Sequence, residues 1–228
     1  MWKSLCAFGV ATLTSFSCTA ADLTALEARW LKGVWPVVSF ARKAMLPLDI
    51  VVQPQPSPDA APLALAFVGG RCKLVLSMRG NPQARSAIEA IEPDLLDATL
   101  ELMAAHELGH CHRYLAGVWH GLPAGFASRV PTELGSDMRV EYVAMQAARR
   151  EEGYADLVGL AWARQQHPEL YPRLHAWLVA ERSADLVPGS HHDTLAWVRL
   201  VDDGTALLDA SIFVGAHALW AAGFRAWD

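Results

Sequence analysis

Apolar and polar residues follow first a helical and then a strand-like period along the chain. Apolar residues recur at helical spacing over residues 22–45. Three strand-like segments follow this helix, at residues 48–53, 63–68 and 71–78. The glycine pair Gly69-Gly70 indicates a hairpin between the last two strands, and the proline-rich stretch 53–58 predicts a surface loop.

The rest of the chain has mainly helical patterns. A short helix is expected after Asn81-Pro82, and a long one begins near Pro93, whose fixed φ suits a first helical position. Further helical segments are predicted at residues 131–145, 154–167, 171–183, 194–201 and 205–224. The pattern predicts an α+β fold, with a small antiparallel or mixed sheet followed by a mostly helical C-terminal half.

The helix that begins near Pro93 contains the motif H-E-x-x-H at residues 106–110. Residues four apart lie on the same face of a helix, so His106 and His110 can bind one metal ion. Glu107 lies about 100° round the helix from His106, within reach of a water on that metal. This arrangement favours a zinc ion that polarises the water, with Glu107 as the general base.

Gly109 lies inside the same helix, where glycine costs roughly 1 kcal/mol relative to alanine. The flanking residues place apolar side chains around the helix, which indicates burial on both faces. We therefore expect another element to approach the backbone closely at Gly109, beside the metal.

A catalytic zinc site of this kind needs a third protein ligand. Glu133 and Asp137 are four residues apart on the predicted helix 131–145, so one carboxylate could bind zinc while the other accepts a hydrogen bond from a ligating histidine. Glu133 is the preferred ligand. Asp137 itself and Glu141, one turn further on, remain alternatives.

With this second motif, the chain resembles the gluzincin metallopeptidases, which combine H-E-x-x-H with E-x-x-x-D on a following helix. The resemblance covers residues 97–145, and Glu133-Leu-Gly-Ser-Asp137 fits the second motif. Carried over by position, it implies the zinc ligands His106, His110 and Glu133, the general base Glu107, and Asp137 as the partner of His106.

The order of strands before the H-E-x-x-H helix also resembles the zincins, in which a small sheet covers the site. There the edge strand pairs with an extended substrate, and residues 73–79 are the candidate for that strand. A histidine-containing loop before a late helix resembles some gluzincins, which implies His192 as the donor to the developing oxyanion. Tyr114, His120 and Tyr142 are weaker candidates for this role.

The first 21 residues predict an export signal. Lys3 precedes a short apolar stretch, and small residues at 19–21 resemble a cleavage site. A membrane anchor and an ordinary first helix are the alternatives. An exported chain would leave residues 22–228 as one domain, in the periplasm or secreted.

Four cysteines are present, and Cys6 and Cys18 fall inside the predicted signal. The remaining pair, Cys72 and Cys111, is expected to form a disulfide, because exported proteins meet oxidising conditions. A buried free thiol is the alternative, and a role for Cys111 as a fourth zinc ligand is disfavoured. The disulfide would tie the candidate substrate strand to the zinc helix.

The formal net charge of −5 argues against a nucleic-acid partner, because phosphate binding requires a basic patch. The last helical segment is apolar but contains Asp209 and His217, which favours a core helix over a membrane span.

We expect an exported endopeptidase with one zinc ion per chain, which hydrolyses a peptide or protein substrate by attack of zinc-bound water assisted by Glu107. The same site could serve an amidase that acts on cell-wall or other non-protein substrates. Two further possibilities are a zincin fold that binds zinc without turnover and a helical protein that binds no zinc.

Overall fold

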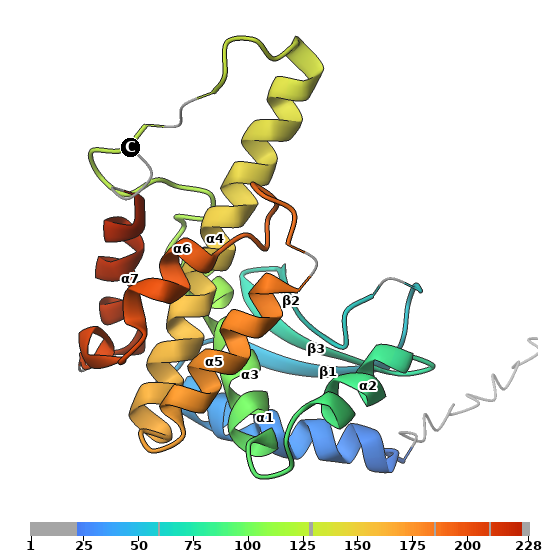
Figure 1. The fold of residues 1–228 in the computed structure, drawn as a ribbon. Coiled ribbons are helices and arrows are strands. Elements are labelled where there is room, and N and C mark those ends of the chain that lie inside the picture. Colours follow the sequence, from blue (N-terminus) through green and yellow to red (C-terminus); the bar gives the residue numbers. More distant parts are fainter. Residues whose placement is uncertain (1–21, 59, 128–129, 185, 210, 225–228) are drawn as a thin grey trace, which may run out of the picture.

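The computed structural model describes residues 22–58, 60–127, 130–184, 186–209 and 211–224. The predicted export signal at residues 1–21 lies outside these described residues. The described chain has an N-terminal helix, a small sheet and a mostly helical remainder (Figure 1). The predicted α+β class and the small mixed sheet are therefore confirmed.

The sheet has three strands, β1 (Leu48–Pro54), β2 (Leu63–Val68) and β3 (Arg71–Arg79), in the order β1-β3-β2. Strand β3 pairs in parallel with β1 and antiparallel with β2. The prediction that residues 73–79 form an edge strand is therefore wrong, because they lie in the centre of the sheet. Burial explains the difference: most of β3 is packed into the core, whereas β2 buries only Leu63.

Polar side chains cap the first turns of the two helices beside the sheet and so fix where each helix begins. Helix α1 (Ala25–Lys43) begins with a capping box, in which Thr24 and Glu27 bind each other's backbone N–H groups. Glu27 also accepts a hydrogen bond of 2.8 Å from Arg79 Nε, which joins the start of the helix to the end of β3. Helix α2 (Pro82–Ala90) begins with a proline after the capping residue Asn81.

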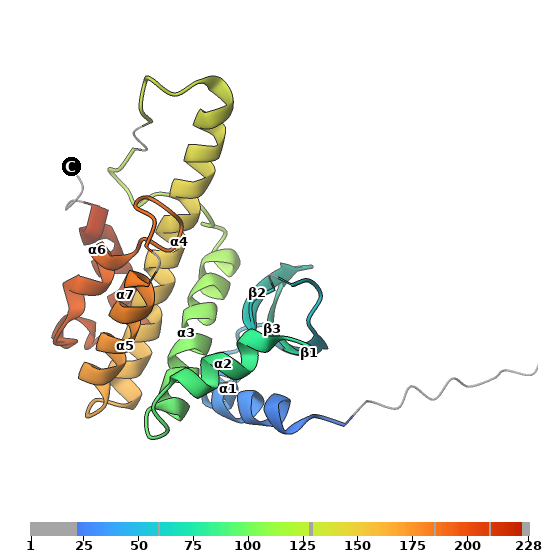
Figure 2. The same ribbon diagram turned by 45° about the vertical axis from the view of Figure 1, so that its right-hand side comes forward.

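Helix α3 (Leu96–Leu115) stands in the middle of the molecule. Figure 2 shows α1, α2 and the sheet on one side of α3 and the later helices on the other. The later helices are α4 (Ser136–Gln166), α5 (Tyr171–Ser183), α6 (Leu195–Val198) and α7 (Ile212–Gly223). Side chains from both sides and from α3 form one continuous hydrophobic core.

Helix α4 joins two predicted segments, 131–145 and 154–167, into one helix of 31 residues. The intervening residues are charged and end in Gly153, which favours a break when the sequence is considered alone. In the structure the helix continues through Gly153, which faces another element: a Cβ there would lie 2.5 Å from the ring of Trp197. The glycine therefore allows close packing inside a helix.

The segment predicted as one helix over 205–224 is instead a short 3₁₀ turn, Thr205–Leu207, followed by α7. Helix α7 has its own start, where the Ser211 side chain accepts a hydrogen bond of 3.3 Å from Phe213 N. The cap at Ser211 thus begins a new helix within a stretch of sequence whose apolar pattern continues without a break.

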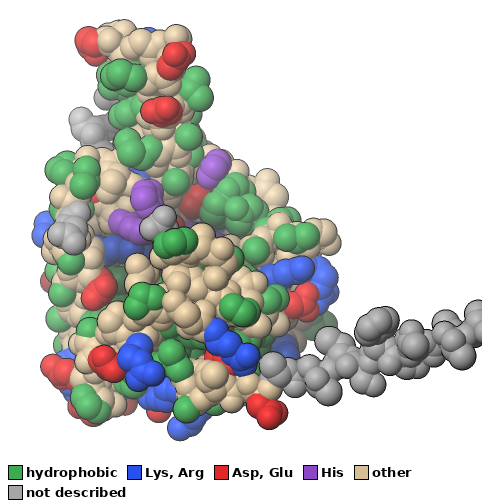
Figure 3. All heavy atoms as spheres, turned by 90° about the vertical axis from the view of Figure 1, so that its right-hand side faces the viewer, with side chains coloured by type: hydrophobic (Ala, Val, Ile, Leu, Met, Phe, Trp, Pro, Cys, Tyr) green, Lys and Arg blue, Asp and Glu red, His purple; other side chains and the backbone are tan. Residues whose placement is uncertain are grey.

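The first part of α4 projects away from the body of the molecule (Figure 1). Met138 and Val140 on this projection are 59% and 71% exposed. Figure 3 shows hydrophobic side chains along the projection and histidines gathered at its base. Among the described residues, no helix combines the length and apolar character that a membrane crossing requires.

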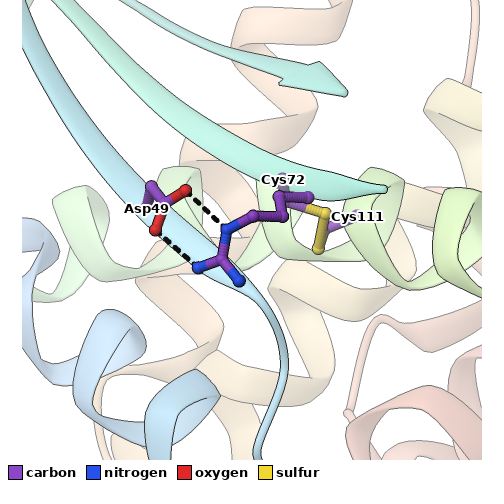
Figure 4. The surroundings of a disulfide bond; sticks show 4 residues. Asp49, Cys72 and Cys111 are labelled. Carbon is purple, nitrogen blue, oxygen red and sulfur yellow. Dashed lines mark hydrogen bonds and ion pairs between the residues drawn. A yellow bond between two sulfur atoms is a disulfide. The ribbon is translucent and has the colours of Figure 1, made fainter. Parts of the chain in front are cut away.

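Cys72 on β3 and Cys111 on α3 are joined by a disulfide, as predicted from the sequence (Figure 4). Their Cα atoms are 5.7 Å apart, within the usual range for a bridged pair. Both cysteines are fully buried. The bridge connects the central strand to the helix that carries the H-E-x-x-H motif.

We predict that Cys72→Ala/Cys111→Ala lowers the free energy of unfolding by about 2–4 kcal/mol, because the unfolded chain regains the freedom that the cross-link removes. Denaturant unfolding of the oxidised protein and the variant measures this difference. Each single variant should lose nearly as much stability as the double variant, since either change removes the bridge. Equal stability of the double variant and the oxidised protein would contradict the prediction.

Candidate functional site

The two histidines of the H-E-x-x-H motif face the same point beside helix α3. His106 and His110 lie one turn apart, and their Nε2 atoms are 3.1 Å from each other. Their rings stand at 89° to each other with centroids 4.8 Å apart. The helical spacing thus places two imidazole nitrogens together, as the sequence predicts.

Glu152 on α4 supplies the carboxylate beside these histidines. Its Oε2 lies 3.3 Å from His106 Nε2, and its Oε1 lies 3.4 Å from His110 Nε2. These three residues form a group whose ligand atoms all lie within 4.8 Å of one another. A tetrahedral zinc ion with bonds of about 2.0–2.1 Å separates its ligand atoms by about 3.3 Å. The spacing and the donor types therefore fit such an ion.

The structure does not bring Glu133 and Asp137 to this group. Both side chains are exposed, and their hydrogen bonds are to their neighbours Thr132 and Ser136. Glu141, the third carboxylate considered from the sequence, is also exposed. The reason is the length of α4: these residues lie on its N-terminal projection or just before it, several turns away from Glu152.

Glu152 and Asp156 have the same E-x-x-x-D spacing as the pair chosen from the sequence. The sequence also contains a signal that distinguishes the two pairs. Asp156 lies within an otherwise apolar run, 154–163, where a carboxylate requires a specific partner. Asp137 lies in a polar segment, where a solvated carboxylate needs none.

Gly109 allows α4 to approach α3 beside the histidines. A Cβ at Gly109 would lie 3.0 Å from the Cα of Ala155 and 3.2 Å from the Cβ of Val158. Ala155 follows Glu152 by less than one helical turn, so this contact sets the distance between the carboxylate and the histidines. The expectation of a close approach at Gly109 is confirmed.

Asp156 orients His106 through the second nitrogen of its ring. It is fully buried, and its Oδ1 lies 2.9 Å from His106 Nδ1. It also accepts hydrogen bonds of 2.6 and 2.8 Å from Arg182 on α5 and one of 2.5 Å from Thr194. Such a partner fixes the tautomer of the imidazole, so that His106 Nε2 is free to bind a metal.

These contacts shift the pKa values of His106 and Asp156. Burial opposes charge on His106, but hydrogen bonds to Asp156 and Glu152 outweigh it and raise the pKa of the imidazole to about 10. Burial would raise the pKa of Asp156, yet the charge of Arg182 and the contacts with His106 hold it well below its usual range. A metal must therefore displace a proton from His106 to bind here.

A cavity of about 460 Å³ opens beside the group, and Glu107 lies on its wall. Burial raises the pKa of Glu107, while the nearby His106 and His110 oppose this shift. Glu107 thus lies next to the histidines and faces the same space. A carboxylate in that place can exchange a proton with a molecule bound in the cavity.

His192 also lines this cavity, as its predicted role requires. Its Nε2 lies 3.9 Å from Glu152 Oε2, and its side chain is 57% exposed. Burial and the charge of Arg182 lower the pKa of His192. Of the weaker candidates, Tyr114 lines the cavity, whereas His120 and Tyr142 are not among its lining residues.

Strand β2 forms one side of the cavity, to which Leu63, Ala64 and Leu65 contribute. One edge of β2 pairs with β3, and β2 ends the sheet on its other side. The sheet edge beside the site is therefore β2, and not the predicted segment 73–79. An edge strand offers unpaired backbone groups that can bind an extended peptide.

Comparisons with protein-family models, curated proteins and solved structures give no match for this chain.

We predict that Gly109→Ala lowers the free energy of unfolding by about 1–3 kcal/mol, although alanine is the better helix former. The added Cβ would lie 3.0 Å from the Cα of Ala155, so the backbone of α4 would have to move by a few tenths of an ångström. Denaturant unfolding measures the loss. Gly135→Ala is the control, because a Cβ there meets nothing within 4 Å. A Gly109→Ala protein as stable as the control would contradict the close contact.

Proposed function

We propose that this protein is an exported zinc-dependent endopeptidase of zincin type, with His106, His110 and Glu152 as the zinc ligands. The observation that carries the proposal is the convergence of two imidazoles and one carboxylate at about tetrahedral spacing beside Glu107. Three protein ligands with an open position are typical of catalytic zinc, whereas structural sites use four.

The residues around the group support hydrolysis of an amide bond. A bound zinc ion would supply Lewis acidity, which polarises the substrate carbonyl and favours deprotonation of the attacking water. Glu107 takes the proton from this water and delivers it to the leaving amine. His192, on the same cavity, donates a hydrogen bond to the oxygen on which negative charge develops.

Peptide substrates suit the shape of the cavity. An extended chain can add to the free edge of β2 and place one of its carbonyl groups beside the histidines. The cavity is lined by both apolar and charged side chains, which suits a peptide backbone with its side chains. Export to the periplasm or beyond is supported by the signal-like residues 1–21 and by the buried disulfide.

We predict that the purified protein binds one zinc ion per chain and that Glu152→Ala loses most of it, because two histidines alone hold zinc weakly. Metal analysis after dialysis measures the content. Glu133→Ala is the matched control and should keep full zinc, since its carboxylate lies outside the group. Loss of zinc in Glu133→Ala with full retention in Glu152→Ala would reverse the assignment.

We predict that Glu107→Gln keeps its zinc but hydrolyses peptides about 10²–10⁴-fold more slowly, because the amide cannot accept a proton. Cleavage of β-casein, followed by mass spectrometry, gives the rate. Glu141→Gln, on the exposed projection, is the control and should be as active as the unchanged protein. An unchanged rate in Glu107→Gln would exclude this residue as the base.

A further inference from the structure

After α3 the chain makes a tight turn at residues 117–121, and Trp119 of this turn lines the cavity. Gly117 and His120 both have left-handed backbone conformations, with φ of 67° and 62°. A hydrogen bond of 2.9 Å from Gly121 N to Val118 O closes the turn. A left-handed conformation is unfavourable for a residue with a side chain, so His120 must be held there by other contacts.

Those contacts come from a buried ion pair between α3 and α4. Arg113 Nε and Nη2 donate to the two carboxylate oxygens of Glu151 at 2.7 and 2.8 Å. Arg113 follows His110 by three residues, and Glu151 directly precedes Glu152. Both side chains are almost completely buried, at 4% and 1% exposed. A buried ion pair is retained only when its remaining hydrogen-bonding groups are satisfied.

Two atoms of this ion pair, Arg113 Nη2 and Glu151 Oε1, also bind the backbone of the turn. Arg113 Nη2 donates to Val118 O and to Gly121 O, at 2.9 Å in each case. Glu151 Oε1 accepts a hydrogen bond of 2.8 Å from His120 N. We call Arg113 and Glu151 together the turn clamp, because they hold both sides of the turn.

The turn presents Trp119 to the candidate metal site. The indole stands edge-on to His110, with centroids 5.6 Å apart and planes at 76°. It stacks on Tyr114 at 3.8 Å, and Tyr114 in turn stacks on Phe67 of β2 at 4.9 Å. Trp119 is only partly buried and lines the cavity. A row of aromatic rings thus runs from the sheet edge to a candidate zinc ligand.

We propose that Trp119 is a specificity-determining residue of this enzyme and that Arg113 and Glu151 are positioning residues that hold it beside the scissile bond. The inference rests on the proposed peptidase function. A substrate bound along β2 would bring a side chain next to the cleaved bond against the indole. An aromatic face of this kind favours a large apolar side chain over a small one.

The turn clamp also fixes the position of Trp119 relative to the candidate metal ligands. Arg113 is on the same helix as His110, and Glu151 is on the same helix as Glu152. Both helices that carry the ligands therefore contact the turn directly. A shift of the turn would move Trp119 relative to the ligands. Displacement of a substrate-binding residue lowers activity even when the catalytic groups stay in place.

The first experiment measures specificity. Cleavage sites in β-casein are mapped, and two peptides are made from the site cut fastest, with phenylalanine or glycine next to the scissile bond. We expect Trp119→Ala to lower kcat/KM for the phenylalanine peptide about tenfold or more and for the glycine peptide only slightly, with the loss mainly in KM. Trp119→Phe should restore most of the preference. Zinc content should stay at one per chain in both variants.

The second experiment tests the turn clamp without any turnover. Hydrogen exchange of residues 116–124 is followed by mass spectrometry in the unchanged protein and in Arg113→Lys, whose ammonium cannot replace the forked guanidinium. We expect the amides of His120 and Gly121 to exchange about fivefold faster or more. If Arg113→Lys does not fold, Glu151→Gln takes its place. Unchanged exchange in a folded variant would overturn the positioning role.

Trp35→Ala is the matched control for both experiments, because Trp35 lies on α1, is 43% exposed and contacts Arg42. It should change neither the peptide preference nor the exchange of the turn. Equal loss of activity on both peptides in Trp119→Ala would overturn the specificity role. Absence of any cleavage by the zinc-loaded, unchanged protein would instead contradict the proposed function itself, so the two failures are distinguishable.

Discussion

The close contact between helices α3 and α4 at Gly109 is the constraint on which the rest of the site depends. A Cβ at this position would lie only 3.0 Å from the Cα of Ala155 on α4, so glycine allows the two helices to come this near. Both helices present candidate site residues at four-residue spacing, His106 with His110 and Glu152 with Asp156. Only at this separation do the carboxylate oxygens of Glu152 reach the two imidazoles at 3.3–3.4 Å.

The charges gathered around this contact are buried, and each is compensated by a specific partner. Asp156 is balanced by Arg182 and by the imidazole of His106, while Thr194 donates to its second oxygen. Burial of an unpaired carboxylate would be very unfavourable, so these hydrogen bonds also fix the positions of their partners. The electrostatic network thereby links α3, α4, α5 and the loop before α6 into one rigid support for the site.

The remaining elements enclose the site and determine what can enter it. The disulfide joins β3 to α3 directly after His110, which holds the sheet against the helix. Strand β2, one of the two edge strands of the sheet, then lies along the cavity. At the other end, the turn that carries Trp119 is fastened by Arg113 and Glu151. The candidate metal ligands and the turn that carries Trp119 are therefore separate groups held by the same two helices.

Features that arise from local spacing could be predicted from the sequence. Helical periodicity placed His106, His110 and Glu107 together, the glycine pair located the β2–β3 hairpin, and the pairing of Cys72 with Cys111 followed from cysteine count and context. Long-range packing brought Glu152 and Asp156, not Glu133 and Asp137, to the histidines, and it placed β2, not residues 73–79, at an edge of the sheet. The reason is physical: a helix fixes which residues share a face, but not which face meets another element. That choice depends on long-range packing, as where α4 comes close to α3 at Gly109 and Glu152, not Glu133, lies beside the histidines.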